Sequence, residues 1–140
     1  MAARKNRLGI LGVAKINERI FPSFALMQRT ELVGIASRSL EKSRQSASRH
    51  GIPKAYGSYE EMLKDPEIDT IYNPLPNHLH AEWTRKAADH GKHVLCEKPL
   101  APTAAEAQDL VAYCENKKVK LMDGFMWPHH PRTQKIKSQL

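Results

Sequence analysis

The stretch Leu8–Asn17, which reads LGILGVAKIN, decides the fold expected for the chain. Its first four residues form an apolar run that predicts a buried strand, and Gly12 permits the tight turn that a strand needs before a helix. A helix is expected to begin near Ala14 or Lys15. From there, apolar residues recur at about helical spacing: Ile16, Ile20, Phe24 and Met27. A small-residue turn between a strand and a helix N-terminus is a binding site for an anion such as phosphate, because backbone N–H groups and the helix dipole point at it.

The same arrangement underlies the dinucleotide fingerprint Gly-x-Gly-x-x-Gly. Aligned on Gly12, this chain keeps only the first glycine and has Ala14 and Asn17 at the other two positions. The loop alone therefore leaves two interpretations open, a phosphate-binding loop and an ordinary strand-to-helix turn. If a dinucleotide binds, the expected loop contacts are Gly12, Ala14, Lys15 and Ile16.

Strand and helix signals alternate along the rest of the chain. Further strands are expected at residues 31–36, 69–73, 93–96 and 119–125. Further helices are expected at residues 40–50, 59–64, 78–90 and 133–140, and one more is expected after Thr103, with its apolar face between Ala107 and Cys114. The expected capping residues are Ser39, Ser58 and Thr103. Alternation with short connections predicts an α/β fold, a Rossmann-type doubly wound parallel sheet with helices on both faces.

Composition narrows the class of protein. The chain has 140 residues, of which 41% are hydrophobic and 26% charged, which is typical of a soluble globular protein. It has no apolar run of membrane-spanning length and no secretory signal, so no membrane partner is expected. Cys96 and Cys114 fit no metal or redox spacing and favour reduced thiols in the cytoplasm. The net charge of +7 is scattered, which favours solubilising charge and attraction for a phosphorylated cofactor over nucleic-acid binding.

Unusual residues follow four of the predicted strands. These segments are Gly12-Val13-Ala14, Ser37-Arg38, Pro74–Asn77 and Glu97-Lys98-Pro99. Because the carboxyl ends of parallel strands meet at one edge of a sheet, where ligands bind at the switch in strand order, these four segments predict one shared site.

The segment after the second strand indicates the choice of cofactor. An acidic side chain there would favour the ribose 2′-hydroxyl of NAD, whereas this chain has Ser37-Arg38. A guanidinium forms charge-assisted forked hydrogen bonds to phosphate, and Lys42 lies one helical turn further on. We therefore predict NADP rather than NAD; the alternative is that Arg38 is a solvated turn residue.

Glu97-Lys98-Pro99 is the sharpest local signal for chemistry. Proline keeps the preceding residue out of the helical region, so Lys98 is expected to be held extended at the strand end, over the cleft. An ammonium group there polarises a substrate hydroxyl or carbonyl and helps to relay a proton during hydride transfer. The alternative is a surface lysine beside a loop proline.

Taken together, these motifs resemble the cofactor half of the glucose-fructose oxidoreductase / inositol dehydrogenase (Gfo/Idh/MocA) family, nearest to its dihydrodiol and xylose dehydrogenase branch. The resemblance lies in Gly12-x-Ala14-x-x-Asn17, Ser37-Arg38, Leu75-Pro76-Asn77-x-x-His80, Glu97-Lys98-Pro99 and Phe125-Met126-Trp127…His130-Pro131. It implies NADP or NAD as cofactor and hydride transfer at a sugar or polyol carbon.

The resemblance also implies roles for single residues. Lys98 matches a catalytic residue near the nicotinamide, and Glu97 matches a position on the cofactor side. Further cofactor contacts are implied for Leu75, Asn77 and His80, and substrate contacts for Trp127 and His130.

No metal is expected. The histidine pairs have no cysteine or carboxylate partners at zinc-like spacing; they are His78 with His80 and His129 with His130.

The family pattern implies a domain boundary close to the end of the chain. We expect a dinucleotide-binding domain at residues 1–131, and at residues 132–140 the start of a helix leading to a missing C-terminal substrate domain with the second catalytic residue. The chain alone is then expected to bind cofactor, to show little turnover, and to self-associate or be marginally stable, with a homo-oligomer as one outcome. The alternatives are a non-catalytic dinucleotide sensor, which would not need Lys98, and, less favoured, an unrelated nucleotide binder.

Overall fold

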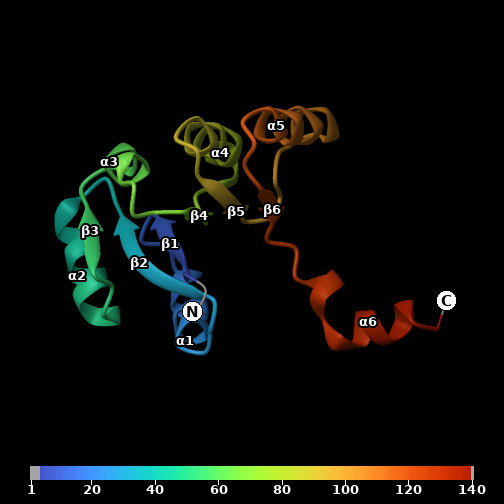
Figure 1. Cartoon of the computed structure of the whole chain (residues 1–140), viewed down its shortest axis with the longest axis horizontal. Helices are drawn as coiled ribbons and strands as arrows, with labels where there is room; N and C mark the ends of the chain where they lie inside the picture. The colour runs from blue at the N-terminus through green and yellow to red at the C-terminus, as the bar shows by residue number, and fades with distance from the viewer. Residues whose placement is uncertain (1–3, 140) are drawn as a thin grey trace.

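Six short strands form one parallel sheet in a computed structural model of the chain, which describes residues 4–139 (Figure 1). The strands are β1 (Asn6–Leu11), β2 (Thr30–Ala36), β3 (Lys54–Tyr56), β4 (Thr70–Asn73), β5 (His93–Cys96) and β6 (Leu121–Asp123). Their order across the sheet is β3-β2-β1-β4-β5-β6, and every pairing is parallel. The order reverses between β1 and β4, which makes this boundary the topological switch point.

Helices cover both faces of the sheet, as expected for the doubly wound class. They are α1 (Asn17–Phe24), α2 (Leu40–His50), α3 (Tyr59–Lys64), α4 (His80–Asp89), α5 (Ala104–Asn116) and α6 (Pro131–Lys137), with single 3-10 turns η1 (Asn77–Leu79) and η2 (Trp127–His129). Figure 1 shows α3, α4 and α5 along one side of the sheet and α1 on the other. The predicted Rossmann-type fold is confirmed.

Two apolar clusters hold the layers together, one on each face. Met62 and Leu63 of α3 pack with Trp83 of α4 against the sheet on one side. On the other side, Ala47 of α2 packs against Ile10 and Ile35, with side chains of α1 around them. Because each strand of a parallel sheet is buried on both faces, its apolar residues form short continuous runs rather than alternating patterns.

The capping residues begin their helices as predicted. The side-chain oxygens of Ser39, Ser58 and Thr103 accept hydrogen bonds from the third backbone N–H of α2, α3 and α5. Gly51 ends α2 in the left-handed conformation at φ 66°, which glycine adopts without steric cost.

Several boundaries differ from those expected. The first helix begins at Asn17, because residues 14–16 form a turn that accepts the first backbone bonds, and it ends before Met27. The helix expected at 78–90 starts as the separate turn η1. The last strand is only Leu121–Asp123, and α6 begins at Pro131; Leu140 lies outside the described residues. The strand β3 was not expected, since three residues are too few to show a periodic pattern.

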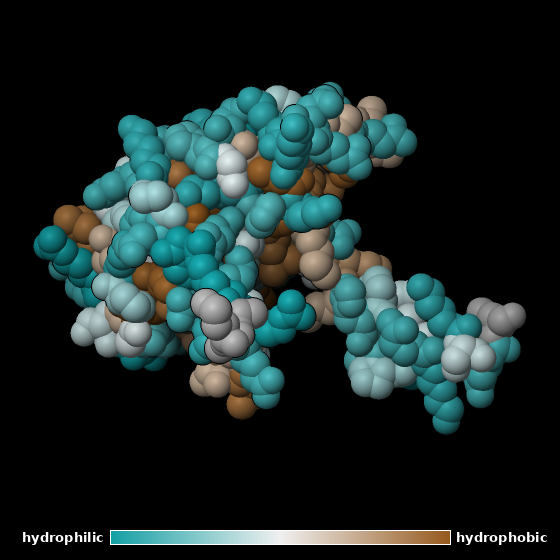
Figure 2. Space-filling view, viewed as in Figure 1, coloured by the Kyte–Doolittle hydropathy of each residue, from teal (hydrophilic) through white to brown (hydrophobic). Residues whose placement is uncertain are grey.

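The segment after β6 leaves the sheet and carries α6 outward, where α6 contacts η2 (Figure 1). Large apolar side chains are exposed on β6 and just after it: Met122, Phe125, Met126 and Trp127. Figure 2 shows an apolar surface in the hollow between the sheet and α6. Within residues 4–139, no helix combines the length and the apolar character needed to cross a membrane.

A half-buried carboxylate connects the short edge strand β3 to the loop before β4. Asp65 Oδ2 accepts hydrogen bonds from Lys54 Nζ (2.8 Å) and Tyr56 Oη (2.6 Å), and Asp65 Oδ1 accepts from the backbone N–H of Glu67 (2.7 Å). Burial by itself would raise the pKa of Asp65, but these hydrogen bonds outweigh burial and lower the pKa from 3.8 to about 2. The ionised form is therefore favoured in the folded protein.

We expect Asp65→Asn to lower the free energy of unfolding at neutral pH by about 1–2 kcal/mol, because charge-assisted hydrogen bonds are lost. Because the folded pKa lies below the unfolded one, the contribution of Asp65 is present above about pH 4 and disappears as pH falls towards about 2. Urea unfolding at neutral pH checks the first statement, and urea unfolding between about pH 4 and about pH 2 checks the second. Asp109→Asn, in an exposed pair with Arg85, is the control and should shift stability by less than about 0.5 kcal/mol. Equal effects of the two substitutions would contradict the prediction.

Candidate functional site

The turn after β1 comes close to the loop after β4. Gly12 has φ 85°, and its N–H donates to the carbonyl oxygen of Ala36 (2.8 Å). A Cβ atom added at Gly12 would lie 3.0 Å from Leu75 Cδ2 and 3.5 Å from Tyr59 Oη. This position therefore needs glycine both for its backbone conformation and for the close contact.

Free backbone donors follow this glycine. Residues 13–16 precede α1, and among the described residues no acceptor takes a hydrogen bond from their N–H groups. Val13 and Lys15 are exposed, while Ala14 and Ile16 are half-buried. Four unpaired N–H groups at the start of a helix, beside a glycine, form the donor set that a phosphate requires.

Asn17 fills the third position of the fingerprint and has a structural role there. Its side chain is 1% exposed, and Nδ2 donates to the carbonyl oxygen of Gly12 (2.9 Å), which closes the turn. Within residues 4–139, Asn17 Oδ1 is buried and has no hydrogen-bond partner. The sequence does not reveal this role of Asn17, because nothing in one sequence distinguishes a buried asparagine from an exposed one.

Arg38 lines a cavity of about 470 Å³ between the ends of β2 and β4. The other lining residues come from α3, the loop after β4 and α4: Ser58, Tyr59, Glu60, Leu75, Pro76, His78, Leu79, Glu82 and Trp83. Burial raises the pKa of Tyr59, and the positive charge of Arg38 opposes this rise. The structure thus brings two predicted cofactor residues, Arg38 and Leu75, to one cavity.

Other predicted residues of this region lie around the cavity. Ser37 is buried, and its Oγ accepts from the N–H of Ser39 (3.2 Å), so its hydroxyl already serves the turn. Lys42 is exposed and lines a separate cavity of about 260 Å³ together with Val13 of the first loop. Asn77 is exposed at the start of η1.

His80 connects the loop after β4 with the turn after β5. Its Nε2 lies 2.6 Å from the carbonyl oxygen of Leu75, and its Nδ1 lies 2.7 Å from the carbonyl oxygen of Pro99. The ring is 1% exposed, and the adjacent Asn73 is fully buried and donates to the backbone of His80 (3.2 Å). The expectation that His80 itself faces a cofactor is therefore corrected: both ring nitrogens are engaged inside the protein.

Glu97 and Lys98 follow β5 at the same edge. The N–H of Glu97 donates to the carbonyl oxygen of Asn73 (3.0 Å), which fixes the end of β5 to the end of β4. Glu97 Oε1 accepts from Tyr72 Oη (2.7 Å). Lys98 is exposed and precedes a cis peptide bond to Pro99. The strand end thus presents a carboxylate held from inside and an ammonium group open to solvent.

The residues predicted to contact substrate lie elsewhere. Trp127 is 54% exposed in η2, and His130 caps α6 by accepting the N–H of Arg132 on Nδ1 (3.2 Å). Neither lines the cavity of about 310 Å³ that contains Glu97. Met126 and His129 do line it, and the sequence carries no signal that separates them from their neighbours.

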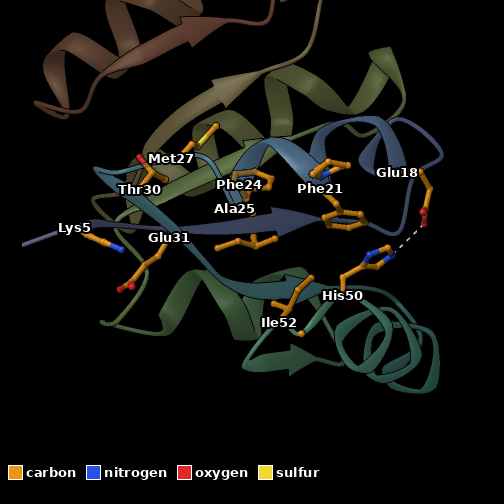
Figure 3. A pocket seen from close by; sticks show the side chains of 13 residues that line it. Lys5, Glu18, Phe21, Phe24, Ala25, Met27, Thr30, Glu31, His50 and Ile52 are labelled. Carbon is orange, nitrogen blue, oxygen red and sulfur yellow. Dashed lines mark hydrogen bonds and ion pairs between the residues drawn. The ribbon is translucent and has the colours of Figure 1, made fainter.

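A larger cavity of about 600 Å³ lies away from these strand ends, between α1, the start of β2 and the end of α2 (Figure 3). The ring of Phe21 stacks on that of His50 at 3.9 Å, and His50 Nε2 lies 3.2 Å from Glu18 Oε1. None of the predicted site residues lines this cavity. In the part of the chain that the structure describes, no group of three histidine, cysteine or acidic residues could hold a metal ion.

The fold and the strand-end site together define a Rossmann domain built to bind a dinucleotide. Residues 6–125 match the model of the oxidoreductase family with an NAD-binding Rossmann fold, Gfo/Idh/MocA, and the chain belongs to this family. The family resemblance predicted from the motifs is confirmed.

Two named relatives and one solved structure illustrate the similarity. The D-xylose 1-dehydrogenase (NADP(+)) 2 of Haloferax volcanii is 46% identical over 91% of this chain and 39% of the relative. The trans-1,2-dihydrobenzene-1,2-diol dehydrogenase of Xenopus tropicalis is 39% identical over 94% of this chain and 41% of the relative. The 3-ketoreductase KijD10 from Actinomadura kijaniata, in complex with NADP and TDP-benzene, superimposes with a TM-score of 0.90 at 34% identity, over 97% of this chain and 42% of that one. The chain therefore spans about two fifths of the length of these relatives.

Two glycine substitutions separate backbone conformation from close contact. Gly51 also has a positive φ of 66°, but an added Cβ there meets nothing within 4 Å. We expect Gly51→Ala to lower the free energy of unfolding by about 1 kcal/mol, the cost of the left-handed conformation. Gly12→Ala should cost about 2–4 kcal/mol, because the contact with Leu75 adds to that cost. Equal shifts in urea unfolding would show that the contact with Leu75 is unimportant.

Proposed function

We propose that the chain is the NADP-binding part of an oxidoreductase that transfers hydride between the nicotinamide cofactor and a sugar, polyol or dihydrodiol. The observation that carries the proposal is the common strand-end edge, where the Gly12 turn, Arg38 and the Glu97-Lys98 pair follow β1, β2 and β5 around the switch point. The names of the similar proteins, which include an NADP xylose dehydrogenase and a dihydrodiol dehydrogenase, support this class of reaction.

The residues present fit a dinucleotide. The unpaired N–H groups of residues 13–16 and the close backbone approach at Gly12 suit the pyrophosphate. Leu75 and Asn77 would lie beside the adenosine, with His80 holding their loop in place.

NADP is favoured over NAD by the charge after β2. Arg38 has an exposed guanidinium and lines the 470 Å³ cavity, and no acidic residue takes its position. A guanidinium there pairs with a ribose 2′-phosphate, with Ser37 beside it and Lys42 one turn along.

Lys98 is the proposed catalytic residue. When bound, NADP supplies the hydride acceptor or donor. In carbonyl reduction, the Lys98 ammonium would hydrogen-bond the carbonyl oxygen, stabilise the negative charge that develops on it and donate a proton to it. In hydroxyl oxidation, the reverse reaction, the Lys98 amine would accept the proton that the hydroxyl releases.

The proposal includes a domain organisation. Residues 1–131 would form the dinucleotide-binding domain, and residues 132–140 would lead into a substrate domain that supplies the second catalytic residue and closes the site over Lys98. The 140-residue chain alone would bind NADP(H) with little turnover. We place the protein in the cytoplasm, as the free and buried Cys96 and Cys114 suggest, with a homo-oligomer as a proposed state.

A second candidate is a dinucleotide sensor without catalysis. It is favoured by the exposure of Lys98, around which the described residues form no closed substrate pocket. The two functions differ in their need for Lys98, because a sensor requires the phosphate loop but no ammonium group near the nicotinamide.

Cofactor choice provides the first test. NADPH should bind more tightly than NADH, and Arg38→Asp should weaken NADPH binding by at least about 2 kcal/mol, because a charge-assisted pair is replaced by repulsion. Fluorescence titration with both cofactors measures this. Arg29→Asp, which makes the same change in charge next to the opposite end of β2, is the control and should leave the affinity within about threefold. Equal affinities of the unmodified protein for NADPH and NADH would contradict the assignment of NADP as the preferred cofactor.

The role of Lys98 provides the second test. In a protein that carries this chain together with a substrate domain, Lys98→Met should lower kcat by about 100-fold or more, the scale of lost acid–base assistance. NADPH affinity should change by less than about threefold, because the adenosine and pyrophosphate contacts remain. Steady-state assays over aldoses, polyols and dihydrodiols measure the effect, with the exposed Lys120→Met as control. Survival of turnover within a few-fold would favour the sensor.

A further inference from the structure

The strand order divides the edge of the sheet into two halves. Arg38 follows β2, on one side of the switch point, and the Gly12 turn lies at the switch point itself. A dinucleotide with its 2′-phosphate at Arg38 and its pyrophosphate at Gly12 therefore extends its other half over β4 and β5. Glu97 and Lys98 follow β5, so they lie at the part of the edge that this half of the cofactor would cover.

The carboxylate of Glu97 is held by a buried tyrosine of the neighbouring strand. Tyr72 of β4 is 3% exposed within the apolar cluster under α1 and α2, and its Oη donates to Glu97 Oε1 at 2.7 Å. Burial, followed by this hydrogen bond to Glu97, raises the pKa of Tyr72, so the phenol keeps its proton and remains a donor. The hydroxyl of Tyr72 hydrogen-bonds a polar partner, whereas its ring packs in the apolar cluster.

Two further contacts fix the same carboxylate. Glu97 Oε2 accepts from the backbone N–H of Lys98 at 3.3 Å. Gly124, after β6, packs against the residue: an added Cβ there would lie 3.0 Å from Glu97 Oε2 and 3.1 Å from Glu97 Cα. Each oxygen accepts one hydrogen bond, and a carboxylate has capacity for about four. The remaining capacity is available to a ligand, and both Tyr72 and Glu97 line a cavity of about 310 Å³.

We propose that Tyr72 is a positioning residue. Its hydrogen bond orients Glu97 so that the carboxylate accepts hydrogen bonds from the hydroxyl groups of the nicotinamide-side ribose. This inference rests on the proposed function, because it assumes that a dinucleotide binds along this edge. A carboxylate with its rotamer fixed in advance loses less conformational entropy on binding than a free one. The contribution of Tyr72 is therefore confined to the nicotinamide half of the cofactor.

The test uses two ligands and a double-mutant cycle on the 140-residue chain, measured by isothermal titration calorimetry. NADPH reports on the whole cofactor, and adenosine 2′,5′-bisphosphate reports on the adenosine half alone. We expect Tyr72→Phe to weaken NADPH by about three- to tenfold, the scale of one hydrogen bond. Its effect on adenosine 2′,5′-bisphosphate should stay within about 1.5-fold. In a Glu97→Ala background, Tyr72→Phe should have no further effect on NADPH, because the two residues act as one unit.

A matched control comes from a second phenol–carboxylate pair. Tyr56 Oη donates to Asp65 Oδ2 at 2.6 Å, away from the strand-end edge, so Tyr56→Phe removes a similar bond and should leave the affinities for both ligands unchanged. Gly124→Ala provides an independent variant that leaves Tyr72 intact. Its Cβ displaces the Glu97 carboxylate and should weaken NADPH selectively, as Tyr72→Phe does.

The outcomes separate this inference from the proposed function. Failure of the unmodified chain to bind NADPH would overturn the proposed function and this inference with it. Normal NADPH binding that Tyr72→Phe leaves unchanged would overturn the inference alone. An equal loss of affinity for both ligands, or effects of Tyr72→Phe and Glu97→Ala that add, would show that Tyr72 supports the fold and not the carboxylate.

Discussion

The pairing of β1 with both β2 and β4 is the constraint on which the site depends. Because parallel crossovers are right-handed, the connection from β1 to β2 passes over one face of the sheet and the connection from β3 to β4 passes over the other. The loops that leave β1 and β4 therefore diverge above a shared boundary. The close approach of Gly12 to Leu75 marks this boundary. A crevice at this position is a property of the topology, and the loop residues only determine what it binds.

Buried polar side chains hold the loops of this edge in place. Asn17 closes the first turn, His80 connects the loop after β4 with the turn after β5, and Tyr72 holds Glu97. Each of these side chains is almost fully buried, while Arg38 and Lys98 above them are exposed. A lower layer of buried residues thus supports the loops, and the residues proposed to contact the cofactor form an exposed upper layer. A substitution in the lower layer is expected to act on binding through geometry and not through lost contact.

Much of the fold could be predicted from the sequence, because its signals are local. The apolar runs of the strands, the caps at Ser39, Ser58 and Thr103 and the stop at Gly51 each act within a few residues. The strand β3 was not predicted, because it is defined by pairing with β2 and not by a pattern in its own three residues. That Arg38, Glu97 and Lys98 lie at one edge was predictable, because the carboxyl ends of parallel strands meet there.

The supporting residues could not be predicted, because their roles are contacts between distant parts of the chain. Tyr72 lies 25 residues from Glu97, and His80 lies 19 residues from Pro99. A tyrosine in a strand or a histidine after a loop is consistent with many environments, so only the fold identifies the partner. His130 has a local role that its family motif did not indicate, since its Nδ1 accepts the N–H of Arg132 and caps α6.

The sheet is bounded on both sides by strands of three residues, β3 and β6. The outer margin of each strand presents only a few unpaired N–H and C=O groups, which is too short a template for another chain to extend the sheet by strand addition. Growth of fibrils from the folded state is disfavoured at both margins. Contacts at the β6 margin would instead form through side chains, since Met122, Phe125, Met126 and Trp127 are exposed beside it.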